Sequence, residues 1–185
     1  MLKISLRLPD TYASEKQDLD EVEWEAVYGS FLNALEQLDN YRIQEGEAMK
    51  TDLEIRINSI EENLGSVEEF EEQRIENIRN KLRQNMQEHF NSNLIDNNRF
   101  EQEIIYYIEK IDISEEKVRL KNHISYFRET LGEEQAGKKL AFISQEMGRE
   151  INTIGSKAND FNIQKLVVKM KDDLEKIKEQ SLNIL

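Results

Sequence analysis

The chain has 185 residues, and its 38 Asp and Glu against 25 Lys and Arg give a formal net charge of −13. This balance argues against nucleic-acid binding by the overall field of the chain, because phosphates are held mainly by Lys and Arg. The absence of cysteine excludes disulfides and thiolate metal sites. No apolar run approaches the ~20 residues that a membrane-spanning helix needs.

The composition favours long helices, since the chain contains one Pro and only seven Gly. Residues 1–17 look irregular, and we expect a linker or the truncated end of an N-terminal domain that is absent here. A helical hairpin is predicted over about 18–92. Its first helix follows helical spacing from Val27 to Leu64, and a Ser-x-x-Glu capping box at Ser66 and Glu69 predicts that a second helix starts there.

Shorter helices are predicted over about 96–132, one of them capped by Ser114. Two more follow over 137–158 and 160–184. In the last, apolar residues from Ile163 to Ile184 recur at spacings of three and four, which is typical of a coiled-coil seam. The predicted fold is therefore all-α, with long antiparallel helices in an extended bundle and a coiled-coil-like C-terminal helix over a helical domain of residues 18–185.

The polar side of the helix over 137–158 carries the clearest candidate chemistry. At about 100° per residue, Gln145, Arg149 and Asn152 share one stripe, and Glu146, Glu150 and Lys157 share the next. Two carboxylates one turn apart can hold a hard divalent cation, and an adjacent Arg can bind a phosphate oxygen. The alternative is a solvated helix face stabilised by local ion pairs.

Two further residues are ambiguous from spacing alone. Glu45 falls where the apolar stripe of the first helix should continue, so it is either a paired carboxylate on a buried face or a sign that the helix leaves the core near Gly46. His123 lies beside the stripe of Leu120 and Ile124, where a histidine is either a core residue or a base. Asp112, Glu115 and Glu116 suit the start of a helix.

The segment Gly137–Ala158, GKKLAFISQEMGREINTIGSKA, resembles the C-terminal signature of the YicC/YloC family of bacterial endoribonucleases. Asp112-Ile113-Ser114-Glu115-Glu116 with Arg119 and His123, the pair Glu45-Gly46, and the tail from Leu174 to Ile184 resemble further motifs of that family. Two positions depart from the pattern: Ala141 replaces a common Asp and Gly148 a common Asn. Nothing resembles the family's α/β N-terminal domain.

The resemblance implies cleavage of RNA by a phosphodiesterase that depends on a divalent cation, Mg²⁺ or Mn²⁺. It also implies a ring-like homo-oligomer in the cytoplasm, with roles in small-RNA decay and stress responses, and no membrane or DNA partner. On this basis Glu146 and Glu150, with Glu45 or Glu103, are expected to bind the metal. The full candidate set has Glu146, Arg149, Glu150 and His123 as catalytic residues and Arg119, Gln145, Asn152 and Lys157 as substrate-binding residues.

Two reaction routes remain open. A metal can activate water and neutralise the scissile phosphate, with Arg149 and Lys157 stabilising the developing charge and His123 as acid or base. Alternatively, the RNA 2′-hydroxyl is the nucleophile, which needs an acid and a base only. The rival function is a non-catalytic oligomerisation or scaffold module of an RNA-processing assembly. A small-molecule enzyme has no motif in its favour.

Overall fold

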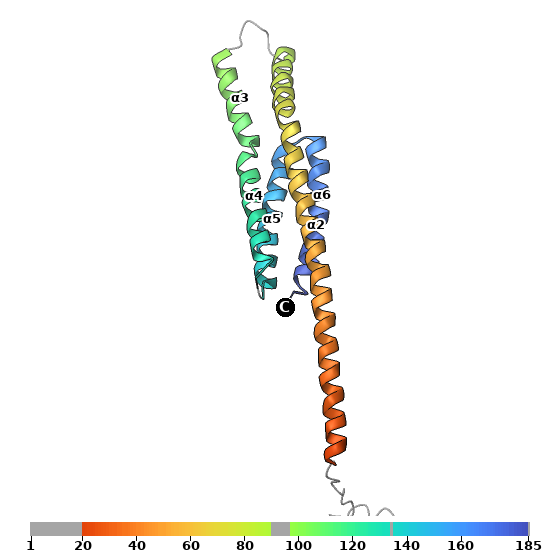
Figure 1. The fold of residues 1–185 in the computed structure, drawn as a ribbon. Helices are drawn as coiled ribbons and strands as arrows, with labels where there is room; N and C mark the ends of the chain where they lie inside the picture. Colours follow the sequence, from red (N-terminus) through yellow and green to blue (C-terminus); the bar gives the residue numbers. More distant parts are fainter. Residues whose placement is uncertain (1–19, 90–96, 134, 185) are drawn as a thin grey trace, which may run out of the picture. The chain divides into compact units, whose positions relative to one another are not determined.

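A computed structural model describes residues 20–89, 97–133 and 135–184, so the expected linker over 1–17 lies outside the described residues. The chain divides into two units, Met1–Glu45 and Gly46–Leu185. Within the described ranges the structure contains five helices and no strand: α2 (Glu21–His89), α3 (Asn97–Ile111), α4 (Ser114–Thr130), α5 (Gly137–Ala158) and α6 (Phe161–Ser181) (Figure 1). The all-α prediction is confirmed, whereas the coiled-coil character of the last helix stays a prediction.

The predicted hairpin over 18–92 is wrong, because α2 continues through the expected break at Ser66. The Ser66 hydroxyl donates a hydrogen bond of 3.1 Å to the carbonyl of Glu62 one turn earlier, as a serine inside a helix does. Leu64 and Val67 on either side are both buried. The apolar stripe therefore passes through this position without a change of direction, and packing of that stripe overrides the capping signal.

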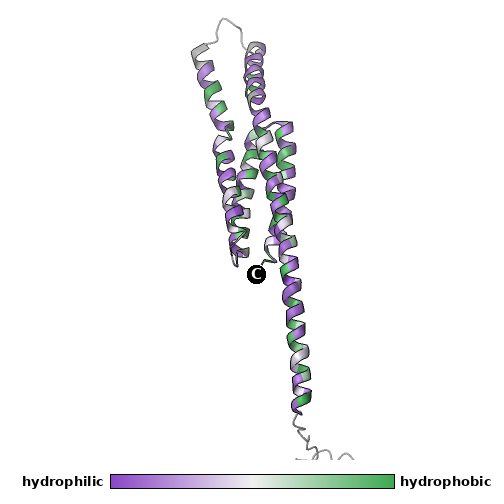
Figure 2. Ribbon diagram, viewed as in Figure 1, coloured by the Kyte–Doolittle hydropathy of each residue, from purple (hydrophilic) through white to green (hydrophobic). Residues whose placement is uncertain are grey.

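The core of the second unit is built from α2, α4, α5 and α6, which lie side by side in Figure 1. Hydrophobic and hydrophilic residues alternate around each of these helices at helical spacing (Figure 2). The fully buried side chains with the largest volumes are Leu53, Ile57, Ile60, Ile104, Ile113, Leu120, Ile124, Phe127, Leu140, Met147, Ile151 and Ile154. This core fixes which face each helix turns outward.

Polar contacts connect α2 to its neighbours on both sides. Asp173 of α6 accepts hydrogen bonds from Arg56 at 3.2 Å and from the Ser59 hydroxyl at 2.7 Å. Arg128 of α4 lies 2.5 Å from a carboxylate oxygen of Glu61. These contacts lie at the edges of the apolar core, where they set the longitudinal register of the helices rather than supply much free energy.

The part of α2 in the first unit is exposed along its whole length, from Glu21 to Glu45. It carries ten exposed large apolar side chains between Val22 and Ile43. Trp24 and Tyr28 stack with ring centroids 6.1 Å apart. Glu45 is itself exposed, so the alternative of a buried carboxylate does not apply within this unit. None of the described helices is apolar and long enough to cross a membrane.

Gly137→Ala is expected to destabilise the fold by about 2 kcal/mol, because a methyl group at this position overpacks a tight contact. Gly137 starts α5 and is buried, and a Cβ there would clash with the carbonyl oxygen of Ile184 and lie 3.1 Å from that of Ser181. Urea denaturation measures the change. Gly132→Ala is the matched control, since its Cβ would have no neighbour within 4 Å. Equal urea midpoints for the two variants would contradict a tight contact at Gly137.

Candidate functional site

Helix α5 presents its polar residues to solvent because its apolar stripe is buried against α4 and α6. Leu140, Ile143, Met147, Ile151 and Ile154 form that stripe. The predicted polar stripes are found on the opposite side: Gln145, Arg149, Asn152 and Ser156 are exposed, and Glu146, Glu150, Thr153 and Lys157 are partly buried. The candidate residues of this helix are therefore accessible, and they share one face.

Glu146 and Arg149 form an ion pair on that face, with Arg149 Nη1 2.9 Å from Glu146 Oε1. The same nitrogen donates a hydrogen bond of 3.2 Å to Oε2. Oε1 is shielded from solvent, and within the described residues it accepts no hydrogen bond. The local ion-pair interpretation therefore holds for these two residues.

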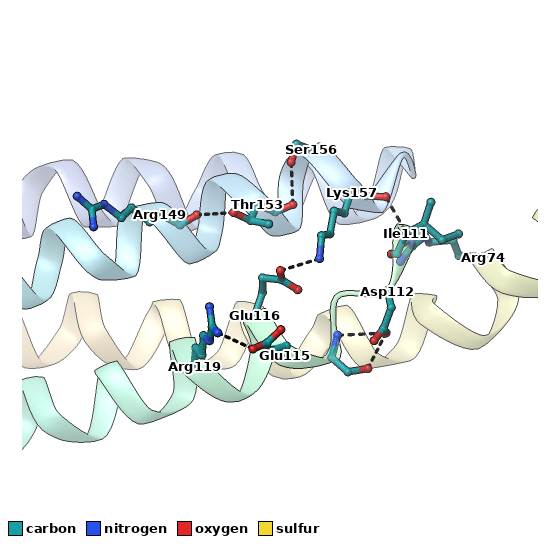
Figure 3. Close-up of polar contacts among 11 residues, drawn as sticks. Arg74, Ile111, Asp112, Glu115, Glu116, Arg119, Arg149, Thr153, Ser156 and Lys157 are labelled. Atoms are coloured by element: carbon teal, nitrogen blue, oxygen red, sulfur yellow. Dashed lines mark hydrogen bonds and ion pairs between the residues drawn. The ribbon is translucent and has the colours of Figure 1, made fainter. Parts of the chain in front are cut away.

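Lys157 is paired with Glu116 of α4, whose carboxylate lies 2.7 Å from the ammonium and is only 6% exposed (Figure 3). Arg119 is paired with Glu115 one turn earlier on α4, at 2.5 Å. Both predicted substrate-binding cations thus already have a carboxylate partner. A bound phosphate would have to compete with these carboxylates.

Arg74 of α2 is 3% exposed and was not a candidate from the sequence. Its Nη2 donates hydrogen bonds to the carbonyls of Ile111 at 2.6 Å and Lys157 at 3.3 Å (Figure 3). Ile111 ends α3 and Lys157 is next to the end of α5, so these carbonyls have no partner within their own helices. Burial lowers the pKa of Arg74 below its usual value, while the negative helix ends favour its charge. Arg74 therefore joins the ends of two helices to α2.

Asp112 organises the turn between α3 and α4. The predicted Ser114 cap is not formed, because Ser114 is already the first residue of α4 and Ile113 occupies the N-cap position. Instead, one carboxylate oxygen of Asp112 accepts hydrogen bonds from the hydroxyl of Ser114 at 2.8 Å and from its backbone N–H at 3.2 Å. The Ser114 hydroxyl is the main reason that the pKa of Asp112 lies below its usual value.

Asp112→Asn is expected to lower stability by about 0.5 kcal/mol at neutral pH, because a negative charge at a helix start is lost. The folded pKa of Asp112 is depressed, so its contribution is present above the unfolded pKa of about 4 and is lost as pH falls through the folded value. Thermal unfolding of both proteins from pH 7 to pH 2.5 measures this. The stabilities of the two proteins should become equal at the acidic end. A difference in stability that persists at pH 2.5 would show that the shape of the side chain, rather than its charge, causes the effect.

The predicted metal ligands are only partly brought together. Within the described residues no group of three or more Asp, Glu or His side chains is placed to hold an ion. Glu103 is exposed on α3 and does not join Glu146 and Glu150, because α3 turns Ile104 rather than Glu103 to the core. Glu45 belongs to the first unit. His123 is partly exposed on α4.

The two departures from the family signature lie away from the exposed polar face. Gly148 is buried, and a Cβ there would lie 3.2 Å from Cδ2 of Leu174 on α6. An Asn at this position would therefore point to the contact between α5 and α6. Ala141 is partly buried near the start of α5.

Comparison with known proteins agrees with the signature in α5. The model of the C-terminal domain of YicC-like endoribonucleases matches residues 67–185, which is more than half of the chain. The chain belongs to this family. It is 36% identical over 181 residues to the probable endoribonuclease YicC of Clostridioides difficile (strain 630), and 31% identical over 180 residues to that of Haemophilus influenzae.

These alignments cover 96% and 97% of the chain but only 62% of each relative. The matched family domain contains Arg74, Glu116 and the whole of α5, whereas Glu45 precedes it. Arg74 had a signal in the sequence that was missed. It follows Val67 and precedes Ile78 at helical spacing, so a cation interrupts an apolar stripe there and must find acceptors when buried.

Proposed function

We propose that this chain is the helical part of an endoribonuclease and that the polar face of α5 takes part in RNA phosphodiester cleavage. The observation that carries the proposal is the partly exposed pair Glu146 and Glu150, one helical turn apart within the matched family domain. Two relatives that align with nearly the whole chain are named as probable endoribonucleases. RNA is accordingly the proposed substrate, and the cytoplasm the proposed compartment.

Carboxylate oxygens are the ligands that a hard divalent cation takes. Glu146 and Glu150 would hold Mg²⁺ or Mn²⁺, with water or phosphate oxygens completing the shell, and Glu146 would have to exchange its contact with Arg149 for the cation. A cation bound there supplies charge neutralisation at the scissile phosphate and a more acidic water. Arg149 forms an ion pair with Glu146, and its exposed guanidinium is the proposed partner of a phosphate oxygen.

His123 and Lys157 have secondary roles in this proposal. Lys157 is held by Glu116, so it would have to leave this carboxylate to bind a phosphate oxygen. His123 is the proposed acid or base, since its ordinary pKa lies near neutrality. Attack by the 2′-hydroxyl and attack by water both remain compatible with this set of residues.

A second candidate function is favoured by the exposed apolar residues of α2. Ten large apolar side chains lie exposed between Val22 and Ile43, and such a run is typical of surfaces that are covered in an assembly. On this proposal the chain is a non-catalytic module that holds a homo-oligomer together. The ion pairs of Arg119, Arg149 and Lys157 agree with it, because each cation is already neutralised.

A ribonuclease assay separates the two functions. We expect this chain alone to cleave single-stranded RNA weakly or not at all, because it carries a net charge of −13 and its cations are paired. The full-length protein should cleave RNA, and EDTA should abolish that cleavage. Light scattering on both proteins gives the subunit number. A full-length protein that forms oligomers but leaves RNA intact with Mg²⁺ or Mn²⁺ would support the scaffold function instead.

A further inference from the structure

A hollow of about 330 Å³ lies where α2, α3 and the turn between α5 and α6 meet, within the second unit. Its polar lining comes from three places along the chain: Arg74, Asn77, Lys81 and Asn85 of α2, Tyr107 of α3, and Asn159 and Asp160 between α5 and α6. Its volume is at the lower end of the range for small-molecule sites. The hollow therefore has room for one small polar ligand.

Arg74 brings a buried positive charge to this hollow. Burial lowers its pKa more than the carboxylates of Glu71, Asp160 and Asp112 raise it, and its Nε is buried without an acceptor among the described residues. Its hydrogen bonds go to two backbone carbonyls, which carry only partial charges. A buried guanidinium in this state is stabilised by an anion. Lys81, two turns further along α2, is exposed and adds a second cation.

The carboxylate in the lining is already engaged. Asp160 caps α6 by accepting hydrogen bonds from the backbone N–H groups of Asn162 at 2.8 Å and Ile163 at 3.1 Å. Its charge interacts with the positive end of that helix and also with the guanidinium of Arg74. The lining thus carries two cations against one carboxylate, although the chain as a whole is strongly acidic.

The rest of the lining suits a nucleobase. Asn77 and Asn85 are exposed amides that both donate and accept hydrogen bonds. Tyr107 is 38% exposed, so part of its ring is open to stacking. Ile78 and Leu82 supply apolar contacts between the two amides. An aromatic ring, amides and cations around one small hollow are the combination that binds single-stranded RNA bases with their phosphates.

We propose that this hollow binds one nucleotide of single-stranded RNA, with Arg74 and Lys81 toward the phosphate and Asn77, Asn85 and Tyr107 toward the base. This inference rests on the proposed function for the identity of the natural ligand. Arg74 also bonds to the carbonyl of Lys157, so the hollow adjoins the C-terminal end of α5. A nucleotide held there positions the rest of the strand relative to the polar face of α5.

Binding of 5′-AMP to this chain tests the site directly. Four ligands are tested separately: 5′-AMP, adenosine, inorganic phosphate and a short single-stranded oligoribonucleotide. NMR titration follows the side-chain amides of Asn77 and Asn85 and the ring of Tyr107. We expect 5′-AMP to shift these signals with higher affinity than adenosine or phosphate alone, and the oligoribonucleotide to compete for the same site.

Two exposed lining residues give variants that should fold normally. Lys81→Gln and Asn85→Ala should each weaken 5′-AMP binding about fivefold or more, and Lys50→Gln, an exposed α2 lysine outside the hollow, should leave it unchanged. Equal affinity for 5′-AMP in all three variants, shifts elsewhere on the chain, or no binding at millimolar concentration would overturn the proposal. Phosphate binding as tightly as 5′-AMP would also overturn it.

The outcome is separable from that of the proposed function. If 5′-AMP binds here but the full-length protein cleaves no RNA, the nucleotide site stands and the ribonuclease proposal fails. If the full-length protein cleaves RNA and 5′-AMP does not bind, the hollow is excluded as a nucleotide site while the polar face of α5 remains the candidate.

Discussion

Arg74→Met is expected to lower the free energy of unfolding by about 3 kcal/mol, one of the two largest effects that the structure predicts. Methionine keeps much of the length of the side chain and removes its donors, so the carbonyls of Ile111 and Lys157 lose their partner. Hydrogen bonds from a charged donor contribute about 1.5–3 kcal/mol each, and the removal of a buried charge offsets part of the loss.

Urea denaturation measures the free energy of unfolding of Arg74→Met and of the control Arg79→Met. Arg79 is a suitable control because it lies on the same helix but is exposed. The control should change stability by less than about 0.5 kcal/mol. Hydrogen exchange should also show earlier opening of the last turns of α3 and α5 in the Arg74 variant. If both variants unfold at the same urea concentration, Arg74 does not join these helix ends.

The helices of the second unit are largely predictable from the sequence because their apolar spacing and their end signals agree. Helix α5 begins at Gly137 and ends at Ala158, as the pattern indicates. Asn159 has a φ of 44°, a left-handed conformation that ends the helix, and Asp160 then caps α6. Local and tertiary preferences coincide at these residues, so the apolar spacing and the end signals together predict where α5 begins and ends.

The continuous α2 could not be predicted, since the local and tertiary preferences disagree there. Ser66 and Glu69 resemble a helix start, yet Leu64 and Val67 pack into the same core and the helix continues through this position. A capping motif starts a new helix only where the chain can turn and pack against another part of the protein. The residues around the motif do not show whether such a packing partner exists.

The sequence predicts which candidate residues share one face of α5, but it does not predict the contacts that these residues make with other helices. Spacing places Glu146, Arg149 and Glu150 together because all three lie on one helix. The partners of Lys157 and Arg74 come from elsewhere: Glu116 is 41 residues from Lys157, and the Ile111 carbonyl belongs to a residue 37 positions from Arg74. Such pairs follow from the packing of the helices, and a single sequence carries no periodic signal for them.

Glu150→Gln in the full-length protein is expected to slow RNA cleavage at least about 100-fold, if the polar face of α5 holds the cation as proposed. The substitution keeps the shape of the side chain and removes its charge. Because Glu150 is only partly buried on the side opposite the apolar stripe, the fold should be retained. Cleavage rates across a Mn²⁺ titration, with circular dichroism as the folding check, measure the effect.

Glu129→Gln is the matched control, an exposed glutamate near the end of α4 remote from Glu116. It should cleave RNA at the parent rate. A Glu150→Gln protein with the parent rate and the parent metal dependence would remove Glu150 from the site.

The chemical ends of the products then separate the two routes. A 2′,3′-cyclic phosphate, or the 3′-phosphate formed when it is hydrolysed, together with a 5′-hydroxyl indicates attack by the RNA 2′-hydroxyl. A 3′-hydroxyl together with a 5′-phosphate indicates attack by water. In the first case the reaction needs an acid and a base, which is the role proposed for His123. A cation held by Glu146 and Glu150 would then only neutralise the charge of the phosphate. In the second case the same two carboxylates also position the nucleophile, and the loss on Glu150→Gln should persist at saturating Mn²⁺.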